Sequence, residues 1–467
     1  MFQIESRAQM SCLPRLKPKR FYDLVVQVAI IRPGPIVGNV MHPYLRRRQK
    51  REPVTYPHPA LKPALERTLG VPLFQEQLLR IAMIAAGFSG GEAEELRRAM
   101  GYKRSEKRMK EIEKKLRRGM EQRGIPGKAQ EEIVSSITSF ALYGFPESHA
   151  ASFALLAYAS AYLKCHYLAA YTAAMLNNQP MGFYSPATLV KDAQRHGLKV
   201  RSTDVTRSDW PCTLEKEDDA WAVRLGMCYV KGMREASAQA LVAERTRRPF
   251  HSIDDLVQRV PALTQAEVLK LAELGALNSL GNPLAAHSAS GKTAFHRRAA
   301  LWQAQRAARP AGPLLESLDE PPSNSPLAPM TPEERLVADF SNAGLTVGRH
   351  PMAWHRAEMQ ALRVWTAADL SQAPHGARVR IAGCVICRQR PGTAKGFVFL
   401  SLEDETGIAN AIVTPDLFER ERVTLIQEPF LLVEGKLQNQ DHAISVKAER
   451  IFPLTGTRPE IPSHDFH

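Results

Sequence analysis

The sequence predicts a multidomain α+β protein. A mostly helical first part is followed by a small helix-hairpin-helix module, a proline-rich linker and a carboxy-terminal five-stranded β-barrel. Three observations lead to this fold class. The chain has 467 residues, about three times the usual size of a domain. Apolar positions recur every three or four residues up to about residue 205. Between about residues 376 and 455 the period shortens to two.

The first predicted domain, residues 1–205, is interpreted as helical because clusters of Gly and Pro separate its periodic stretches. One apolar stripe runs from Met109 to Met120 and predicts a helix that ends at Gly124. The other face of that helix is almost entirely Lys and Arg. A strongly basic surface is therefore expected on this domain.

The middle of the chain is divided into a helical module and a linker. Residues 206–285 contain short helical patterns separated by Gly-bearing turns, which predicts a helix-hairpin-helix module. Residues 286–345 form a linker and connecting segment, because the prolines repeated up to about residue 330 prevent a packed helix or a central strand.

The last predicted domain, residues 346–467, contains five short alternating segments rich in β-branched and aromatic residues, with turns between them. A helix-like stretch follows the third segment, and this pattern predicts a barrel of the OB type. Cys384 and Cys387 have the spacing of half a zinc site, but no second Cys or His pair has a compatible spacing. They are therefore predicted to be ordinary strand residues.

The charge balance favours a polyanionic partner. Lys and Arg exceed Asp and Glu by 14, and the sequence pI is about 9.6. Basic residues can also simply solvate helix faces, and composition alone leaves both interpretations open. The six cysteines have no disulfide-framework spacing, and the sequence contains no leader or membrane-spanning pattern, so a reducing cytoplasm is the expected location.

The densest basic element surrounds a predicted helix break at Gly101. Arg97 and Arg98 precede the break, and Lys103 and Arg104 follow it. Guanidinium forks bind phosphate oxygens bidentately and a lysine adds a point charge, so four converging cations are suited to a triphosphate. A solvated basic helix face is the alternative.

Two shorter motifs allow both a functional and a structural interpretation. Arg32 precedes Pro33-Gly34-Pro35, a rigid turn that would hold its guanidinium still next to a phosphate. A plain turn on the surface explains the same residues. His149 lies at the start of a strongly apolar helix, where a cap or a core contact is more common than a catalytic role.

Longer blocks of sequence resemble a known family. These blocks are FQIESRAQMSCLPRLKPKRFYDLVVQVAIIRPGPIVGNVMHPYLRRR, PLFQEQLLRIA, GFSGGEAEELRRAMGYKR and YGFPESHAASFALLAYASAYLKCHY. They are similar, in family order over about the first 170 residues, to the fingers domain of bacterial C-family DNA polymerases, the family of the DNA polymerase III alpha subunit. Because the sequence ends soon after the barrel strands, it resembles the carboxy-terminal portion of the error-prone branch.

The resemblance implies roles for specific residues. Arg97 and Arg98 would contact the incoming deoxynucleoside triphosphate, with Lys103, Arg104 and Arg32 as further candidates. The palm aspartates that hold Mg²⁺ in the family have no counterpart before the fingers motif of this sequence, and no PHP domain precedes it. We therefore expect Mg²⁺ only in a complete enzyme, and no catalytic or metal-binding residue in this chain.

Two further groups are candidate DNA contacts. In the hairpin module, backbone amides at Lys231-Gly232 and the following helix start can hold a phosphate, and Arg234 lies beside them. In the barrel, the first turn is a candidate for binding single-stranded template by charge and stacking. Its predicted contacts are Arg388, Arg390 and Lys395, preferred over Phe397 and Phe399.

The expected partners are primer-template DNA, deoxynucleoside triphosphates, a Y-family-like accessory protein and the sliding clamp, with no membrane. Residues 75–79, Gln-Glu-Gln-Leu-Leu, resemble a clamp-binding pentapeptide only faintly, and an amphipathic helix explains them better. Three functions remain open: part of an error-prone, translesion DNA polymerase acting in DNA repair, a truncated DNA-binding protein without catalysis, or a basic helical scaffold with no nucleic-acid role.

Overall fold

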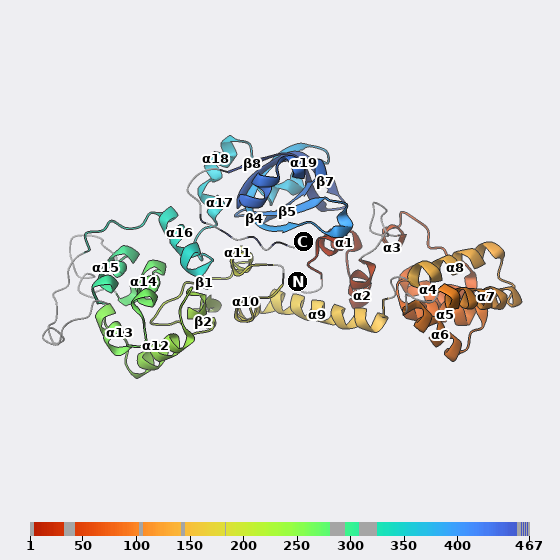
Figure 1. Cartoon of the computed structure of the whole chain (residues 1–467), viewed down its shortest axis with the longest axis horizontal. Helices are drawn as coiled ribbons and strands as arrows, with labels where there is room; N and C mark the ends of the chain where they lie inside the picture. The colour runs from red at the N-terminus through yellow and green to blue at the C-terminus, as the bar shows by residue number, and fades with distance from the viewer. Residues whose placement is uncertain are drawn as a thin grey trace. The chain divides into compact units, whose positions relative to one another are not determined.

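The computed structural model describes most of the chain. The described residues are 4–31, 43–101, 106–141, 145–182, 184–280, 295–307, 325–454, 459, 461, 463 and 465. Contacts between Cα atoms divide the chain into two units, which consist of residues 1–162 with 440–443 and residues 163–439 with 444–467. Figure 1 shows the helices and strands in chain order.

The described part of the first unit is helical, as the sequence predicts. Its helices are α1 (Arg7–Leu16), α2 (Phe21–Ile30), α3 (Pro43–Arg48), α4 (Lys62–Leu65), α5 (Gln75–Ala86), α6 (Gly90–Gly101), α7 (Glu106–Gln122), α8 (Gly127–Ala141) and most of α9 (Glu147–His166). Helices α4 to α8 share a core in which Leu78, Leu96 and Leu116 are fully buried. The predicted stripe is confirmed at Ile112, Leu116 and Met120, which face this core from α7.

A second core joins α1, α2, α3 and α9. Arg48 on α3 binds Asp23 on α2 through both terminal nitrogens, Nη1 at 2.8 Å and Nη2 at 2.7 Å from the two carboxylate oxygens. Ala150 and Ala154 of α9 are buried in the same core. Residues 75–79 form the first turns of α5, where Leu78 is buried, so the helical interpretation of this segment is confirmed. Among the described residues, no helix is both long and apolar enough to cross a membrane.

The second unit begins with two helices and a small sheet that the sequence did not reveal. The elements are α10 (Leu168–Asn177), α11 (Pro186–Arg195), β1 (Val200–Arg201), β2 (Thr213–Glu217) and β3 (Ala220–Arg224). The strand order is β1-β3-β2, with β1 parallel and β2 antiparallel to β3. Asp218 has φ +51° in the turn between β2 and β3. Only helices were predicted after residue 206, because these strands are short and β2 is mostly polar.

The hairpin module follows as α12 (Glu235–Arg247), α13 (Ile253–Arg259) and α14 (Gln265–Leu274). Two more helices, α15 (Arg297–Ala307) and α16 (Pro332–Ala343), pack on α14 within the segment predicted as linker. Helix α16 begins with a capping box in which Thr331 and Glu334 bond each other's backbone N–H groups. The proline-rich stretch 308–324 lies outside the described residues.

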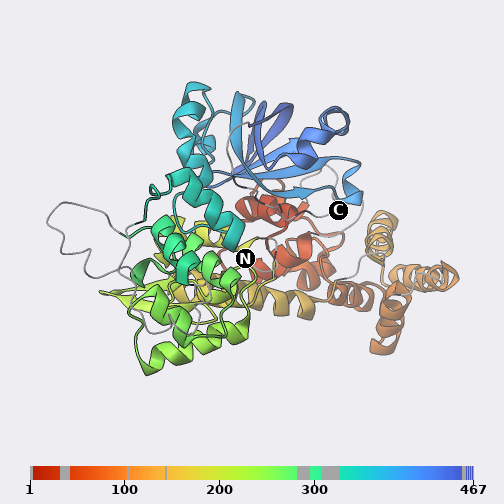
Figure 2. The same cartoon turned by 60° about the vertical axis from the view of Figure 1, so that its left-hand side comes forward.

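The predicted five-stranded OB-type barrel is confirmed. After α17 (Pro351–Trp354) and α18 (Arg356–Ala361), its elements are β4 (Arg378–Gln389), β5 (Val398–Glu403), β6 (Ile408–Val413), α19 (Pro415–Arg420), α20 (Arg422–Gln427), β7 (Phe430–Gln440) and β8 (Ala443–Pro453). The barrel closes in the order β4-β5-β6-β8-β7. Figure 2 shows its strands in blue from a second side. Inward-facing Val385, Leu400 and Val433 are fully buried in its core.

A buried ion pair connects α11 to the barrel. Arg195 donates from Nη2 to Oε1 of Glu403 at 2.7 Å, and the Thr188 hydroxyl donates to Oε2 at 3.3 Å. Burial raises the pKa of Glu403 to about 7, although Arg195 opposes the shift. Since a buried carboxylate is costly without partners, this contact fixes α11 against β5.

Candidate nucleic-acid interface

A tight turn precedes α12 in the hairpin module. Gly232 has φ +77°, a conformation that favours glycine. Nearby, Lys270 on α14 donates from Nζ to the carbonyl oxygen of Lys231 at 2.7 Å. A Cβ atom on Gly232 would lie 2.9 Å from this Nζ. The turn therefore brings a lysine of α14 next to the backbone that begins α12.

Glu267 fixes the geometry of this turn. Its carboxylate is almost fully buried and accepts from the backbone N–H of Arg234 at 2.9 Å and from Nη2 of the same residue at 2.9 Å. It also accepts from the backbone N–H of Thr264 at 2.8 Å. Burial by itself raises the pKa of Glu267, but the hydrogen bonds from Arg234 and Thr264 lower it to about 2. The charged carboxylate thus connects the start of α12 to the start of α14.

The loop between β4 and β5 presents two cations of the barrel. Lys395 is exposed and has φ +50°, and Gly396 follows with φ +83°. The guanidinium of Arg390 lies over the ring of Phe418, 4.4 Å from its centroid, and 3.7 Å from a carboxylate oxygen of Glu419. Stacking on Phe418 restricts the guanidinium while leaving the side chain 45% exposed.

Arg388 is mostly buried. Its Nε donates to the carbonyl oxygen of Leu425 at 2.5 Å, and its Nη2 donates to that of Glu428 at 2.8 Å. Its Nη1 contacts Ser463 and lies 3.3 Å from a carboxylate oxygen of Asp465. These bonds hold the end of α20 against β4. Most of the N–H donors of Arg388 are therefore used inside the chain.

The outer surface of the barrel carries a half-buried aromatic ring. Along β5 buried and half-buried residues alternate, so Phe399 and Ser401 lie on the face opposite the core. The register places Phe399 opposite Ile412 and Ser401 opposite Asn410 on β6. A base could stack on such a mixed surface next to the cations of the loop.

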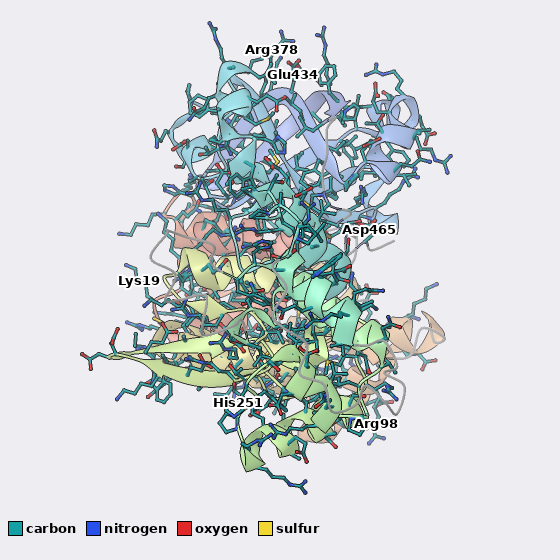
Figure 3. All side chains as sticks on the ribbon, turned by 90° about the vertical axis from the view of Figure 1, so that its left-hand side faces the viewer. Lys19, Arg98, His251, Arg378, Glu434 and Asp465 are labelled. Carbon is teal, nitrogen blue, oxygen red and sulfur yellow. The ribbon has the colours of Figure 1, made fainter. Side chains whose placement is uncertain are left out.

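In the first unit, Arg97 and Arg98 lie near the end of α6. Arg97 binds Glu94 bidentately, with Nε–Oε2 at 2.8 Å and Nη2–Oε1 at 2.7 Å. Arg98 is 3.3 Å from the same carboxylate and its side chain is 72% exposed. The hydrogen bonds from Arg97 lower the pKa of Glu94 to about 2. The Arg98 side chain is labelled in Figure 3.

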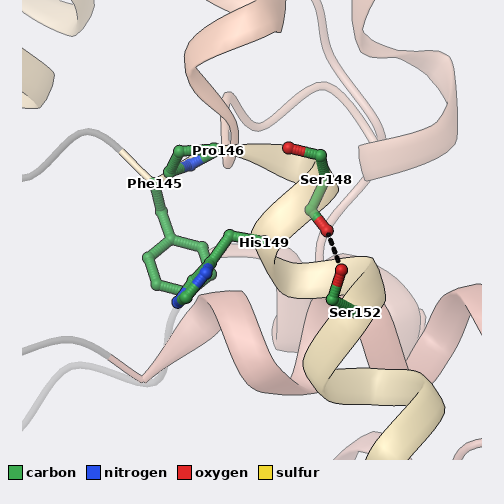
Figure 4. A pocket seen from close by; sticks show the side chains of 5 residues that line it. All are labelled: Phe145, Pro146, Ser148, His149 and Ser152. Carbon is green, nitrogen blue, oxygen red and sulfur yellow. Dashed lines mark hydrogen bonds between the residues drawn. The ribbon is translucent and has the colours of Figure 1, made fainter.

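A pocket opens at the start of α9 (Figure 4). It is lined by Phe145, Pro146, Ser148, His149 and Ser152. The His149 ring lies edge-on to two aromatic rings, 5.1 Å from the centroid of Phe145 and 4.4 Å from that of Phe153. This packing agrees with the structural interpretation of the histidine.

Three family models match separate parts of the chain. They are the bacterial DNA polymerase III alpha subunit finger domain over residues 1–124, a helix-hairpin-helix motif over residues 197–286, and an OB-fold nucleic acid binding domain over residues 379–454. A protein of Anaeromyxobacter dehalogenans (strain 2CP-C) named error-prone DNA polymerase is 46% identical over 476 residues, which include 100% of this chain. The chain belongs to the bacterial DNA polymerase III alpha-subunit family.

A second relative, also named error-prone DNA polymerase, comes from Aromatoleum aromaticum and is 48% identical over 97% of this chain. The chain spans only 41% and 43% of the length of these two relatives and aligns with their carboxy-terminal portion. Among solved structures, an asparaginyl-tRNA synthetase of Pyrococcus horikoshii covers 20% of this chain with 22% identity and a TM-score of 0.18.

The predicted contact residues of this family member stay predictions, but most can be placed. Arg97 and Arg98 come together around Glu94. Arg32, Lys103 and Arg104 lie outside the described residues. In the hairpin module Lys231 donates from Nζ to the carbonyl oxygen of Phe340 at 2.8 Å, and the turn groups Lys231, Gly232 and Arg234 with Lys270. In the barrel, the Arg388 donors face inward while Arg390 and Lys395 lie on the exposed loop.

Within the described part of the chain, no group of three or more His, Cys, Asp or Glu side chains could hold a metal ion.

Sequence reasoning missed two residues that shape the hairpin. Glu267 and Lys270 both lie on α14, more than thirty residues after the turn they contact. The spacing of Thr264 and Glu267 is that of a capping box, so the helix start could have been predicted. The bond from Glu267 to Arg234 depends on the tertiary fold and has no local sequence signal.

The charged carboxylate of Glu267 should stabilise the hairpin module. Its folded-state pKa lies below the ordinary value, so this stabilisation is fully present above about pH 4.5 and is lost as the pH falls toward 2. At pH 7 we expect Glu267→Gln to destabilise the module by about 1.5–3 kcal/mol, the usual size for hydrogen bonds to a charged group. Thermal unfolding of the full chain at pH 7 and pH 3.5 measures the effect. The difference from wild type should be smaller at pH 3.5.

Glu235→Gln is the matched control for this variant, because Glu235 is exposed at the start of α12, next to Arg234, with which Glu267 pairs. It should unfold like wild type at both pH values. A Glu267→Gln variant that also unfolds like wild type at pH 7 would show that the carboxylate does not stabilise the turn.

Proposed function

We propose that this chain provides the nucleotide-contacting and DNA-holding surfaces of an error-prone DNA polymerase. One observation carries the proposal: all of the chain aligns at 46% identity with a relative of that name. Exposed cations on its finger, hairpin and barrel modules support it. The proposed domains are residues 1–205, 206–285 and 346–467, connected by 286–345. The palm would come from the region of the relatives with which this chain does not align.

The proposed reaction is DNA-directed DNA synthesis, in which the primer 3′ hydroxyl attacks the α-phosphate of a deoxynucleoside triphosphate and pyrophosphate leaves. Mg²⁺ bound by the palm would stabilise charge on the attacking and leaving oxygens. The proposed role of this chain is to bind and orient the nucleotide and the DNA. Arg97, whose guanidinium is oriented by Glu94, and Arg98 would contact the triphosphate, with Arg32, Lys103 and Arg104 as further candidates.

DNA would be held by the two modules of the second unit. Around the hairpin turn, Arg234 pairs with the carboxylate of Glu267. Lys231 and Lys270 donate from Nζ to backbone carbonyl oxygens, which leaves an excess of positive charge at the turn. Positive charge and backbone amides at a helix start are suited to a phosphate of duplex DNA. On the barrel, Arg390 and Lys395 would hold single-stranded template, with Phe399 as a stacking surface.

The relatives are named error-prone DNA polymerase, and we extend the proposal to translesion synthesis during DNA repair. Such a polymerase needs primer-template DNA and deoxynucleoside triphosphates. A Y-family-like accessory protein that brings the sliding clamp would complete the assembly. These partners belong to the proposal for the whole enzyme.

A DNA-binding protein without polymerase activity is the second candidate. The observation in its favour is that a helix-hairpin-helix motif and an OB-fold nucleic acid binding domain match residues 197–286 and 379–454. Phosphate contacts by such modules would need neither a nucleotide nor a metal ion. Primer extension distinguishes the two candidates. The chain is mixed with the amino-terminal region of the Anaeromyxobacter dehalogenans relative, up to the point where the alignment begins, and with primer-template, nucleotides and Mg²⁺. Extension supports the polymerase, whereas binding of primer-template without extension supports the second candidate.

The two finger arginines can be tested in that mixture. In Arg97→Ala/Arg98→Ala, KM for the nucleotide should rise by about 10- to 100-fold, because each charge-assisted hydrogen bond contributes about 1.5–3 kcal/mol. Affinity for duplex DNA, measured by fluorescence anisotropy, should stay nearly unchanged. Arg117→Ala/Arg118→Ala, an adjacent pair on α7, is the matched control and should leave KM unchanged. An unchanged KM in the first variant would refute the assignment of Arg97 and Arg98.

The barrel loop can be tested without a second polypeptide. Lys395→Ala should weaken binding of the full chain to an oligo-dT strand by about three- to tenfold, the loss expected for one phosphate contact. Arg378→Ala is the matched control, because Arg378 is exposed at the other end of β4 and is paired with Glu449 at 2.9 Å. Equal affinities of the two variants would contradict the assigned role of the loop.

A further inference from the structure

One helix of the first unit exposes far more apolar surface than a folded protein normally presents to water. From Ala150 to Leu163, α9 has no charged residue. Only one side is buried, along the spacing of Ala150, Ala154 and Ala157. The large exposed residues on its other sides within this unit are Leu155 (59% exposed), Leu156 (48%), Tyr158 (51%) and Tyr162 (47%). A helix that is apolar all round is normally buried on all sides.

This apolar surface extends onto α2. Phe21, at the start of α2, is 44% exposed and its ring lies edge-on to that of Tyr158, 6.3 Å between centroids. Tyr158 stacks in turn on Tyr162 at 6.5 Å. We call Phe21, Leu155, Leu156, Tyr158 and Tyr162 the α9 surface. A contiguous exposed apolar patch of this kind marks a site of protein contact.

We propose that the α9 surface binds the amino-terminal region of the polymerase, the part of the relatives with which this chain does not align. That region amounts to more than half of the relatives' length, since the chain spans 41% and 43% of them. In the relatives it precedes the aligned part, so its end lies just before the residues that align with α1 and α2. Because Phe21 of α2 belongs to the α9 surface, a region that ends there in the relatives would be close to the corresponding surface.

The chemistry of the surface indicates the kind of contact. Without charged side chains it offers no ion pairs, so its partner must present apolar and aromatic groups rather than phosphates. Aromatic side chains are enriched among residues that contribute most to protein interfaces. The α9 surface would therefore hold the palm-bearing region against the first unit, which also carries Arg97 and Arg98, while DNA is bound by the basic surfaces described above. This inference rests on the proposed polymerase function.

Binding of two purified polypeptides tests the proposal. The probe is the amino-terminal region of the Anaeromyxobacter dehalogenans relative, and isothermal titration calorimetry measures its affinity for the full chain. Wild type should bind. Leu155→Asp should weaken binding at least about tenfold, because a charge would be buried in an apolar interface. Tyr162→Asp is a second variant with the same expected loss. Circular dichroism checks that both variants fold, as expected for exposed positions.

Met83→Asp is the matched control, because Met83 on α5 is a large apolar residue that is 42% exposed outside the α9 surface. It should bind the probe like wild type. The proposal would be overturned if the wild-type chain did not bind the probe, or if Leu155→Asp and Met83→Asp bound it with equal affinity. It would also be overturned if the chain self-associated instead of binding the probe and Leu155→Asp abolished that self-association. DNA affinity, measured on the same samples, should be unchanged in all variants. If the chain binds DNA but not the probe, only this inference fails; if it binds the probe but not DNA, only the proposed DNA contacts fail.

Discussion

A cation can neutralise a nucleic-acid phosphate only with the donors that the protein's own carboxylates and carbonyls leave unused. The chain carries a net charge of +14, but not every basic side chain has donors left to bind a phosphate. Arg388 gives its donors to the carbonyl oxygens of Leu425 and Glu428 and to the neighbourhood of Asp465. Lys395, seven residues later, is exposed on the barrel loop. The proposed function depends on exposed cations such as Lys395.

Carboxylates nevertheless contribute to such a surface when they orient a cation without covering it. Glu94 holds the guanidinium of Arg97 in a bidentate pair while 47% of the Arg97 side chain stays exposed. Glu267 does the same for Arg234, which is 57% exposed beside a buried carboxylate. A guanidinium held in place loses less side-chain entropy when it binds a ligand. Glu94 and Glu267 therefore preorganise cations at two places in the chain.

The sequence predicted those parts of the fold that local patterns determine. The predicted segment 378–389 became β4, because β-branched residues between flanking turns define a strand. Its burial alternates only at the start, and residues 381–387 are all buried. The apolar stripe of α7 was also predicted from its periodicity. The sheet of β1, β2 and β3 was not predicted, since its strands have five residues or fewer and β2 is mostly polar, with Leu214 as its one apolar residue. Helix α16 was missed because prolines before it dominated the interpretation of the segment.

The sequence could predict which residue types form the candidate site, but not which groups of the folded chain each of them contacts. Arg97 and Arg98 stand out because they end a helix beside a glycine. That Arg388 would turn inward could not be foreseen, because its acceptors at Leu425 and Asp465 lie 37 and 77 residues away in the chain. The exposure of Leu155 and Tyr162 likewise depends on which faces of α9 the fold leaves uncovered.

The affinity of the full chain for DNA as a function of salt concentration tests the central claim most directly. Anisotropy titrations with single-stranded and duplex DNA between about 50 and 200 mM salt give the slope of log K against log salt, which reports the number of phosphates neutralised. Two or more contacts predict a slope of about −1.5 or steeper, with measurable affinity at low salt. A negligible affinity at the lowest salt, or an affinity that does not change with salt, would contradict the account.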